Sequence, residues 1–262
     1  MGTAGGSYAE YAVAWEHTTF RIPEWLPFEA AATIPLAAFT AAVGLFLELG
    51  LPAPWERPPA SSSTKIPLLI NGASSATGLF AVKLAQLSSS SIGPIICTAG
   101  RSASSVTDLG GDDITVLDYR SSSMQEDIQR ALQASTAAPL RHVLDTANSP
   151  RSAGYLSAAL AAGSGGGACA FTQKWDPAFD AAGVFGRGTR LARIWVGTVH
   201  DDTTGVGKDF GFVWAAFFAR LLRQRRLEPH PYQLVPRGLH GVEGALRTLM
   251  ERKEGNAKFV FR

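Results

Sequence analysis

The chain has 262 residues, enough for one large domain or two small ones, and either could bury a hydrophobic core. Hydrophobic residues make up 46% of it and charged residues 18%, as in an ordinary soluble globular protein. The formal net charge of +2 is too small to indicate a nucleic acid or an anionic membrane surface as a partner. The densest basic run, RLLRQRR at 220–226, follows an apolar stretch, so we expect a solvated helix C-terminus rather than a binding patch.

Cysteine and histidine usage gives no sign of a metal site. Cys97 and Cys169 each lie in a short apolar segment, which favours buried free thiols in a reducing compartment over a disulfide. No Cys/His cluster has metal-ligand spacing. The first residues are not typical of a signal peptide, and charge, Gly or Pro interrupts the apolar runs around 28–51 and 210–222. We therefore expect no metal, no membrane span and a cytoplasmic protein.

The first predicted elements precede a linker rich in proline and serine. Residues 7–22 alternate enough to predict one or two strands, and residues 23–28 predict a turn. The Ala- and Leu-rich stretch 28–49 predicts a helix that is interrupted at Pro35 and ends before Gly50. The linker at 52–65 separates this helix from the first clear strand.

Strands and helices then alternate over the middle of the chain. Helices are expected at 77–87, around 103–109, at 123–133 and at 151–161. Strands are expected near 66–71, 94–98, 114–118, 142–146, 167–171 and 191–196. This alternation predicts an α/β fold in which βαβ units form one mostly parallel sheet with helices on both faces.

The alternation of strands and helices ends at about residue 206. A long helix is expected at 209–225, a second at 240–253 and a closing strand at 257–262. Neither this part nor the N-terminal part fits the alternating pattern, so we expect both to belong to one other domain into which the α/β unit is inserted. The expected boundaries are 1–36, 37–205 and 206–262. Residues 7–22 should then approach residues 228–262.

The turn after the first clear strand, NGASSATG, has the layout of a dinucleotide-binding turn. Gly72 and Gly78 occupy the positions for the tight turn and for close helix–strand packing, and Ser75 replaces the middle glycine. A serine narrows backbone access there, but its hydroxyl can donate to a phosphate oxygen, and the helix N-terminus offers free N–H groups. The alternative is a strand–turn–helix without a ligand.

The end of the next strand favours NADP(H) over NAD(H). Sites for NAD carry an acidic residue there to bind the ribose 2′-hydroxyl, but the first acid after this strand is Asp108. Arg101 and Ser102 suit a 2′-phosphate instead, through a charge-assisted contact. The alternative for Arg101 is a surface arginine in a turn.

The order of these segments resembles the medium-chain dehydrogenase/reductase superfamily over essentially the whole chain. The resemblance lies in GSYAEYAVAWEHTTFRIPEWLPFEAAATIPLAAFTAAVGLF, in LLINGASSATG, in LGGDDITVLDYRS and in the ending LEPHPYQLVPRGLHGVEGALRTLMERKEGNAKFVFR. The serine- and threonine-rich turn is similar to that of fungal trans-acting enoyl reductases of the lovastatin type. The resemblance implies a Rossmann-type doubly wound sheet inserted in an incomplete GroES-like substrate domain.

The resemblance also implies a function. Members of this family are zinc-free NADPH enzymes that reduce α,β-unsaturated acyl thioesters for a polyketide synthase in secondary metabolism. The implied partners are the carrier-bound polyketide and its synthase, with the enzyme a monomer or homodimer. A quinone or small-enone oxidoreductase of the same superfamily is one alternative. The other is a truncated, non-catalytic remnant that binds NADPH or the synthase.

Positions of the family's cofactor residues can be carried over. The residues expected to hold NADPH are Ser74, Ser75, Ala76 and Thr77 on the turn, Ala99, Gly100, Arg101 and Ser102 at the 2′-phosphate, and Tyr119, Phe171, Thr172, Gly255 and Asn256. Without the resemblance, Tyr119 could equally be an aromatic residue packed at a strand end.

The acyl substrate is expected along two segments. These comprise Ala41, Ala42, Val43, Gly44, Leu45, Phe46, Leu47 and Glu48, and Ala192, Arg193, Ile194, Trp195 and Val196. Composition alone would make 41–48 an ordinary core helix. No catalytic residue is assigned, because the histidines follow no spacing that indicates a proton donor.

Family members carry a longer N-terminal part that forms most of the substrate domain. From its absence here we expect a chain that binds NADPH but reduces enoyl thioesters poorly, because transition-state positioning needs both walls of the cleft.

Overall fold

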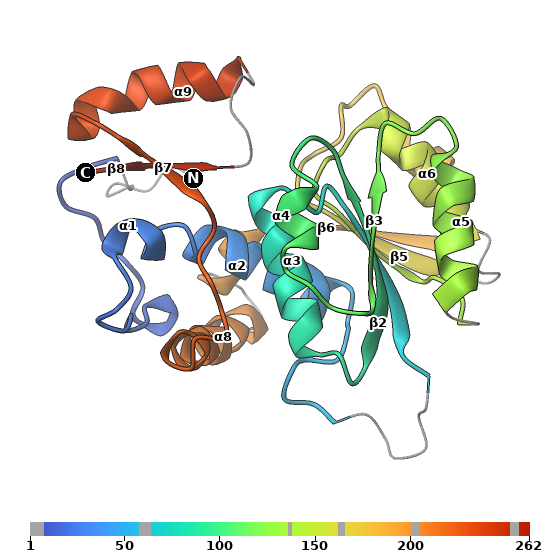
Figure 1. Cartoon of the computed structure of the whole chain (residues 1–262), viewed down its shortest axis with the longest axis horizontal. Helices are drawn as coiled ribbons and strands as arrows, with labels where there is room; N and C mark the ends of the chain where they lie inside the picture. Colours follow the sequence, from blue (N-terminus) through green and yellow to red (C-terminus); the bar gives the residue numbers. More distant parts are fainter. Residues whose placement is uncertain (1–7, 58–63, 136–137, 162–165, 201–204, 252–256) are drawn as a thin grey trace. The chain divides into compact units, whose positions relative to one another are not determined.

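The computed structural model describes residues 8–57, 64–135, 138–161, 166–200, 205–251 and 257–262 (Figure 1). Contacts divide the chain into a central unit, Thr40–Trp195, and a flanking unit made of Met1–Phe39 and Val196–Arg262. The sequence predicts boundaries at 36/37 and 205/206, whereas the contacts change at 39/40 and 195/196. That the flanking unit belongs to a GroES-like domain stays a proposal.

The central unit contains the predicted parallel sheet. Its strands are β1 Ile66–Asn71, β2 Ile92–Ala99, β3 Ile114–Asp118, β4 His142–Asp145, β5 Gly167–Phe171 and β6 Thr189–Arg193. They are arranged in the order β3-β2-β1-β4-β5-β6, and every neighbouring pair is parallel. This is the doubly wound order, and it confirms the predicted fold class. In doubly wound folds ligands bind in a crevice at the carboxyl ends of the strands where the strand order reverses, and here the order reverses between β1 and β4.

Helices cover both faces of this sheet. They are α3 Ala76–Leu87, α4 Ser104–Thr107, α5 Met124–Ser135, α6 Pro150–Ala161 and α7 Ala181–Phe185. Figure 1 shows α3 and α4 on one face and α5 and α6 on the other. On the α5/α6 face, Leu69 and Ile96 from the strands pack with Ile128 and Leu156 from the helices in one buried cluster. Burial of both faces explains why the strands are continuous apolar runs rather than alternating ones.

The helical stretch before the linker is broken, as predicted, near Pro35. It consists of α1 Phe28–Ala31, α2 Pro35–Ala42 and a π-helical turn, η2 Val43–Glu48. Proline suits the first position of α2, where its missing N–H is not needed. By length and composition Phe28–Glu48 could cross a membrane, but 61% of its most apolar window is buried, as in the core helices of soluble proteins.

The flanking unit brings the two ends of the chain together. Besides α1 and the first part of α2, its elements are η1 Glu16–Thr18, η3 Val196–Val199, α8 Val206–Arg223, β7 Tyr232–Val235, η4 Gly238–Gly241, α9 Val242–Met250 and β8 Lys258–Phe261. The ring centroids of Tyr8 and Phe261 are 6.0 Å apart, and Lys258 Nζ donates to the Thr33 carbonyl at 2.8 Å. Residues near the N-terminus therefore approach the C-terminal segment, as the inserted-domain interpretation requires.

The prediction of strands at 7–22 is wrong for the residues that the structure describes. Residues 8–22 contain only the short η1 turn, and none of them pairs with a strand. Alternation predicts a strand only where one face is buried, whereas Tyr11 and Val13 are 89% and 85% exposed. The basic run at 220–226 does lie at a helix end, because α8 ends at Arg223 with Arg220 and Arg223 in its last turn.

Candidate cofactor site

The turn after β1 uses its two glycines as the sequence predicts. Gly72 has a φ of +77°, and a Cβ there would lie 2.6 Å from Thr146 Oγ1. A Cβ at Gly78 would lie 2.4 Å from the Gly72 carbonyl oxygen. Gly72 therefore makes the tight turn, and Gly78 allows α3 to approach β1 closely.

Ser75 is the N-cap of α3, and its polar groups are engaged within the chain. Its hydroxyl accepts a hydrogen bond from Gly78 N–H at 3.0 Å and lies 2.9 Å from Thr146 Oγ1. Its N–H donates to the Gly72 carbonyl at 2.9 Å. The expected phosphate contact from this hydroxyl would therefore compete with an existing bond.

Three other residues of the turn still offer donors. The N–H groups of Gly72, Ala73, Ser75, Gly78 and Leu79 donate to acceptors in the chain. Within the described ranges, the N–H groups of Ser74, Ala76 and Thr77 have no such acceptor. These three residues are half-buried, so the start of α3 presents free N–H groups at the positive end of the helix dipole.

The end of β2 forms a small platform with the end of β3. A Cβ at Gly100 would lie 2.5 Å from Cε1 of Tyr119, so only glycine lets this ring pack on the backbone. Tyr119 N–H donates to the Ala99 carbonyl at 3.1 Å, and the side chain of Tyr119 remains 46% exposed. A half-exposed ring at a strand end can pack on one side and receive an adenine or ribose on the other. This platform fits the adenosine end of a dinucleotide.

A positive charge is available beside this platform. Arg101 is exposed, and over the described part of the chain it forms no ion pair; Ser102 next to it is half-buried. The neighbouring Asp118 is already paired with Arg120, whose guanidinium donates to it at 2.6 Å and lowers the pKa of the carboxyl to about 2. The charge of Arg101 is thus free for an anionic ligand.

Beneath the turn lies a buried hydrogen-bond network that the sequence analysis missed. In register, Asn71 on β1 faces Thr98 on β2 and Asp145 on β4. Asn71 Nδ2 donates to Asp145 Oδ1 at 2.7 Å, and Asn71 Oδ1 accepts from the hydroxyls of Thr98 and Tyr155 at 2.5 and 2.6 Å. Thr98 Oγ1 in turn accepts from Gly72 N–H at 3.1 Å. The network fixes the ends of three strands where the crevice opens.

Asp145 also anchors the loop after β4. Its side chain is fully buried, and Oδ1 accepts from the N–H groups of Ala147 and Asn148 at 2.9 and 3.1 Å. The pKa of this carboxyl is raised, because the effect of burial outweighs that of the hydrogen bonds from Asn71 and the two amides, which lower it. Asn148 adopts a φ of +46°, in the left-handed region that asparagine enters more readily than most residues. The loop is therefore held in one shape.

The expected nicotinamide end lies partly outside the described residues. Phe171 is buried at the end of β5 with its ring 5.8 Å from that of Trp175, and Thr172 N–H donates to the Asp145 carbonyl at 3.1 Å. Gly255 and Asn256 lie outside the ranges that the structure describes.

Most of the first expected substrate segment is core. Ala41, Ala42, Val43, Gly44 and Leu45 are buried, and Phe46, Leu47 and Glu48 are half-buried. A Cβ at Gly44 would lie 2.7 Å from side-chain atoms of both Ile194 and Leu144, so η2 packs tightly on the sheet. Burial raises the pKa of Glu48, and the charge of Arg190 opposes this rise.

The second expected substrate segment is mixed. Ala192 and Ile194 are buried, whereas Arg193 and Trp195 are exposed, with the guanidinium 5.5 Å from the indole centroid. Val196 is half-buried and belongs to the flanking unit. Substrate contact by these residues stays a prediction.

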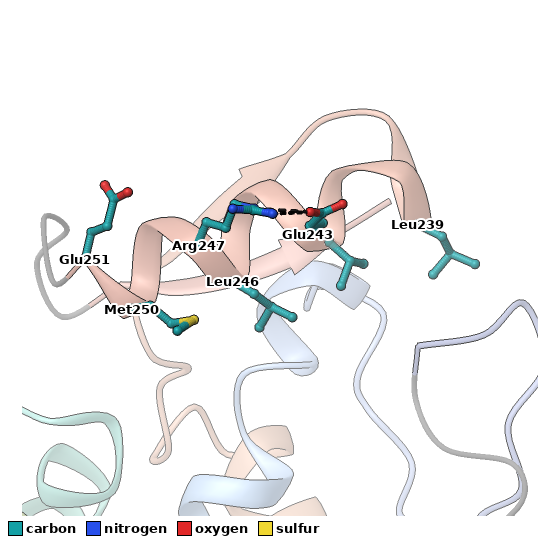
Figure 2. A pocket seen from close by; sticks show the side chains of 7 residues that line it. Leu239, Glu243, Leu246, Arg247, Met250 and Glu251 are labelled. Carbon is teal, nitrogen blue, oxygen red and sulfur yellow. Dashed lines mark hydrogen bonds and ion pairs between the residues drawn. The ribbon is translucent and has the colours of Figure 1, made fainter.

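Two further features lie outside this site. No group of three His, Cys, Asp or Glu residues among the described positions could hold a metal ion. In the flanking unit, a shallow hollow lies along η4 and α9, with Leu239, Leu246 and Met250 beside the Glu243–Arg247 ion pair (Figure 2). It contains none of the predicted site residues.

Comparison with solved structures defines the fold. No family model matches the chain. CurK enoyl reductase matches with a TM-score of 0.64 and 20% identity over 90% of this chain and 62% of that one. An NAD-dependent alcohol dehydrogenase matches with a TM-score of 0.68 and 23% identity over 97% of this chain and 64% of that one. At these identities the likeness shows the fold alone, which this chain shares with both structures.

Sequence comparison defines the family. The trans-enoyl reductase resD of Aspergillus sclerotiorum is 30% identical over 268 aligned positions, 98% of this chain and 73% of that protein. The trans-enoyl reductase fsr4 of Gibberella fujikuroi is 51% identical over 118 residues, 44% of this chain but only 34% of that protein. The chain belongs to the fungal trans-enoyl reductases.

Proposed function

We propose that the chain binds NADPH at the ends of β1 and β2 and reduces α,β-unsaturated acyl thioesters as a trans-acting enoyl reductase. The observation that carries the proposal is the donor set of the crevice: free N–H groups at the start of α3, beside the Gly100–Tyr119 platform. A nicotinamide cofactor fits this donor set, because its pyrophosphate needs N–H donors and its adenosine needs a flat apolar face. The names of the relatives supply the reaction class.

The choice of NADPH over NADH rests on Arg101 and Ser102. An exposed guanidinium without an acidic partner among the described residues favours a 2′-phosphate through charge-assisted bonds. The neighbouring Asp118 is already engaged at both carboxylate oxygens by the guanidinium of Arg120.

The bound cofactor would supply the hydride for the β-carbon of the enoyl group. The chain's own part is to hold the thioester in a fixed orientation and to keep water away. Within the central unit, the half-buried Phe46, Leu47 and Glu48 and the exposed Arg193 and Trp195 are the predicted substrate residues that a ligand can reach without repacking the core. No residue is assigned as the donor of the α-carbon proton.

The proposed partners follow from the thioester chemistry. The acyl chain would be carried by the carrier domain of a polyketide synthase in secondary metabolism, and the reaction would take place in the cytoplasm. The enzyme would act as a monomer or homodimer.

The test is an assay of nicotinamide oxidation with a crotonyl thioester of pantetheine. Deuterium at the transferring position of NADPH should appear at the β-carbon of the butyryl product in the mass spectrum. A simple enone and a quinone serve as parallel substrates. Consumption of either one with no conversion of the thioester would favour the alternative oxidoreductase and contradict the proposal. Binding without conversion of any substrate would favour the non-catalytic alternative.

A further inference from the structure

We propose that Thr146 is a positioning residue for the cofactor turn and that Ser75, which it holds, caps α3 instead of binding phosphate. The proposal rests on the proposed NADPH site and assigns its phosphate contacts to Ser74, Ala76 and Thr77. Thr146 lies in the loop after β4, in direct contact with the turn after β1.

Hydrogen positions in this cluster follow from the acceptors alone. Thr146 Oγ1 is 2.9 Å from the carbonyl oxygens of both Asn71 and Gly72, which can only accept, so its one hydrogen points to them. With the Thr146 hydroxyl donating to these carbonyls, we assign Ser75 as the donor in its 2.9 Å bond with Thr146. Because Ser75 Oγ also accepts from Gly78 N–H, its hydroxyl hydrogen and an acceptor site are both in use.

The same bonds explain how this turn works without a middle glycine. Ser75 has an ordinary φ of −68°, so nothing in its backbone requires glycine. The direction of its side chain is decisive, and the hydrogen bond to Thr146 holds the Ser75 hydroxyl toward the loop after β4. The backbone N–H groups of Ala76 and Thr77 then stay clear for an anion.

Thr146 is itself held rigidly, which a positioning residue requires. Its N–H donates to the Asn71 carbonyl at 3.0 Å, and the buried Asp145 before it binds the two following amides. Gly72 leaves the space for its side chain, since a Cβ there would meet Thr146 Oγ1 at 2.6 Å. The loop after β4 thus holds the turn after β1 in position through the hydrogen bonds of Thr146.

Thr146→Val is a suitable probe because it should fold. The Asn71 carbonyl keeps Thr146 N–H as a donor, and the Gly72 carbonyl keeps Ser75 N–H. Neither carbonyl is left without a partner, and valine has nearly the shape of threonine. Thr146→Ser retains the hydroxyl and is the rescue variant. Thr107→Val is the matched control, since among the described residues the Thr107 hydroxyl bonds only the Ser104 carbonyl of its own helix.

The first measurement is a double-mutant cycle on NADPH affinity. Thr146→Val and Ser75→Ala should each raise the Kd for NADPH about tenfold. The double variant should also raise it only about tenfold, because both substitutions remove the same Ser75–Thr146 hydrogen bond. Thr146→Ser and Thr107→Val should stay within about twofold of the unchanged chain. Additive losses of about a hundredfold would mean that Ser75 contacts the phosphate directly, and would overturn the proposal. An unchanged Kd for Thr146→Val, or failure of Thr146→Ser to rescue, would overturn it as well.

The second measurement is independent of the cofactor. Amide hydrogen exchange without nucleotide should be about tenfold faster at Ser75 and Gly78 in Thr146→Val, and unchanged in Thr146→Ser. If the unchanged chain binds no NADPH, the proposed function fails while this measurement still decides the role of Thr146. Equal exchange rates in Thr146→Val and the unchanged chain would overturn that role.

Discussion

Single residues at the strand ends decide what this site can bind. Gly78 has no room for a side chain, Gly100 lies under the ring of Tyr119, and Arg101 carries an unneutralised charge within the described structure. Each of these is a local feature that one substitution removes. Their separate effects can therefore be measured one at a time.

Arg101→Ala should weaken NADPH binding at least tenfold while leaving NADH nearly unchanged. Loss of one charge-assisted phosphate contact costs about 1.5–3 kcal/mol, and NADH has no 2′-phosphate to lose. Fluorescence titration of both nucleotides measures this. Arg187→Ala, which removes an exposed arginine elsewhere in the central unit, is the control and should change neither affinity. Equal weakening of both nucleotides by Arg101→Ala would place the arginine away from the 2′-position.

Gly78→Ala should lower the free energy of unfolding by about 1–3 kcal/mol. The new Cβ would lie 2.4 Å from the Gly72 carbonyl oxygen and 2.7 Å from the Ala73 Cα, and neither backbone atom can move alone. Gly154→Ala in α6 is the matched control, because nothing lies within 4 Å of its Cβ position. Urea denaturation should show Gly154→Ala to be more stable by about 0.5–1 kcal/mol. A stable Gly78→Ala would contradict the close approach of α3 and β1.

At the scale of elements, the sequence predicts the helices and strands themselves well, but it predicts poorly which segments pack against one another. The six strands, the break at Pro35 and the helices of the central unit follow from apolar runs and helix signals. The five-residue α7 is too short for periodicity to reveal. Residues 8–22 alternate without a buried face, so the pattern was misleading there.

The same limit applies to the site. Glycines of the turn can be assigned from their spacing, but the partner of Ser75 lies 71 residues away in Thr146. The pairing of Asn71 with Asp145 depends on β1 lying beside β4, which no local signal encodes. Asparagine, threonine and aspartate at the ends of three apolar strands were the only available signal. Only the strand order turns them into a network.

Lys258 on β8 is partly buried, so its positive charge lowers the stability of the folded chain. Burial lowers the pKa of Lys258 from its usual 10.5 to about 8, although Nζ still donates to the Thr33 carbonyl. Between these pH values the unfolded chain holds the proton that the folded chain has released, so the free energy of unfolding should rise with pH.

Lys258→Met should remove that rise. Denaturation at pH 8 and pH 10 should show the unchanged chain gaining about 1–3 kcal/mol relative to the variant over this window. Comparison with the variant cancels the other groups that titrate there. A constant difference between the two chains across the window would show that Lys258 keeps its ordinary pKa.

At the scale of the whole molecule, the two cysteines report on the integrity of the central unit. Cys97 on β2 and Cys169 on β5 are fully buried, and burial raises the pKa of both thiols, that of Cys97 to about 12. Neither is an accessible thiolate. The sheet must open before either can react.

Labelling of the native chain with a thiol reagent should therefore be slow and should follow unfolding. We expect both cysteines to react only as the urea transition is crossed, with the two sites labelled together because they share one sheet. Rapid reaction of either thiol without denaturant would contradict the described core.

The dinucleotide site is the central claim, and comparative titration of the chain with NADPH and NADH tests it most directly. Quenching of intrinsic fluorescence gives both dissociation constants under the same conditions. We expect saturable binding of both nucleotides at one site, with NADPH at least tenfold tighter because of its 2′-phosphate. Equal affinities, or no binding of either nucleotide, would contradict it.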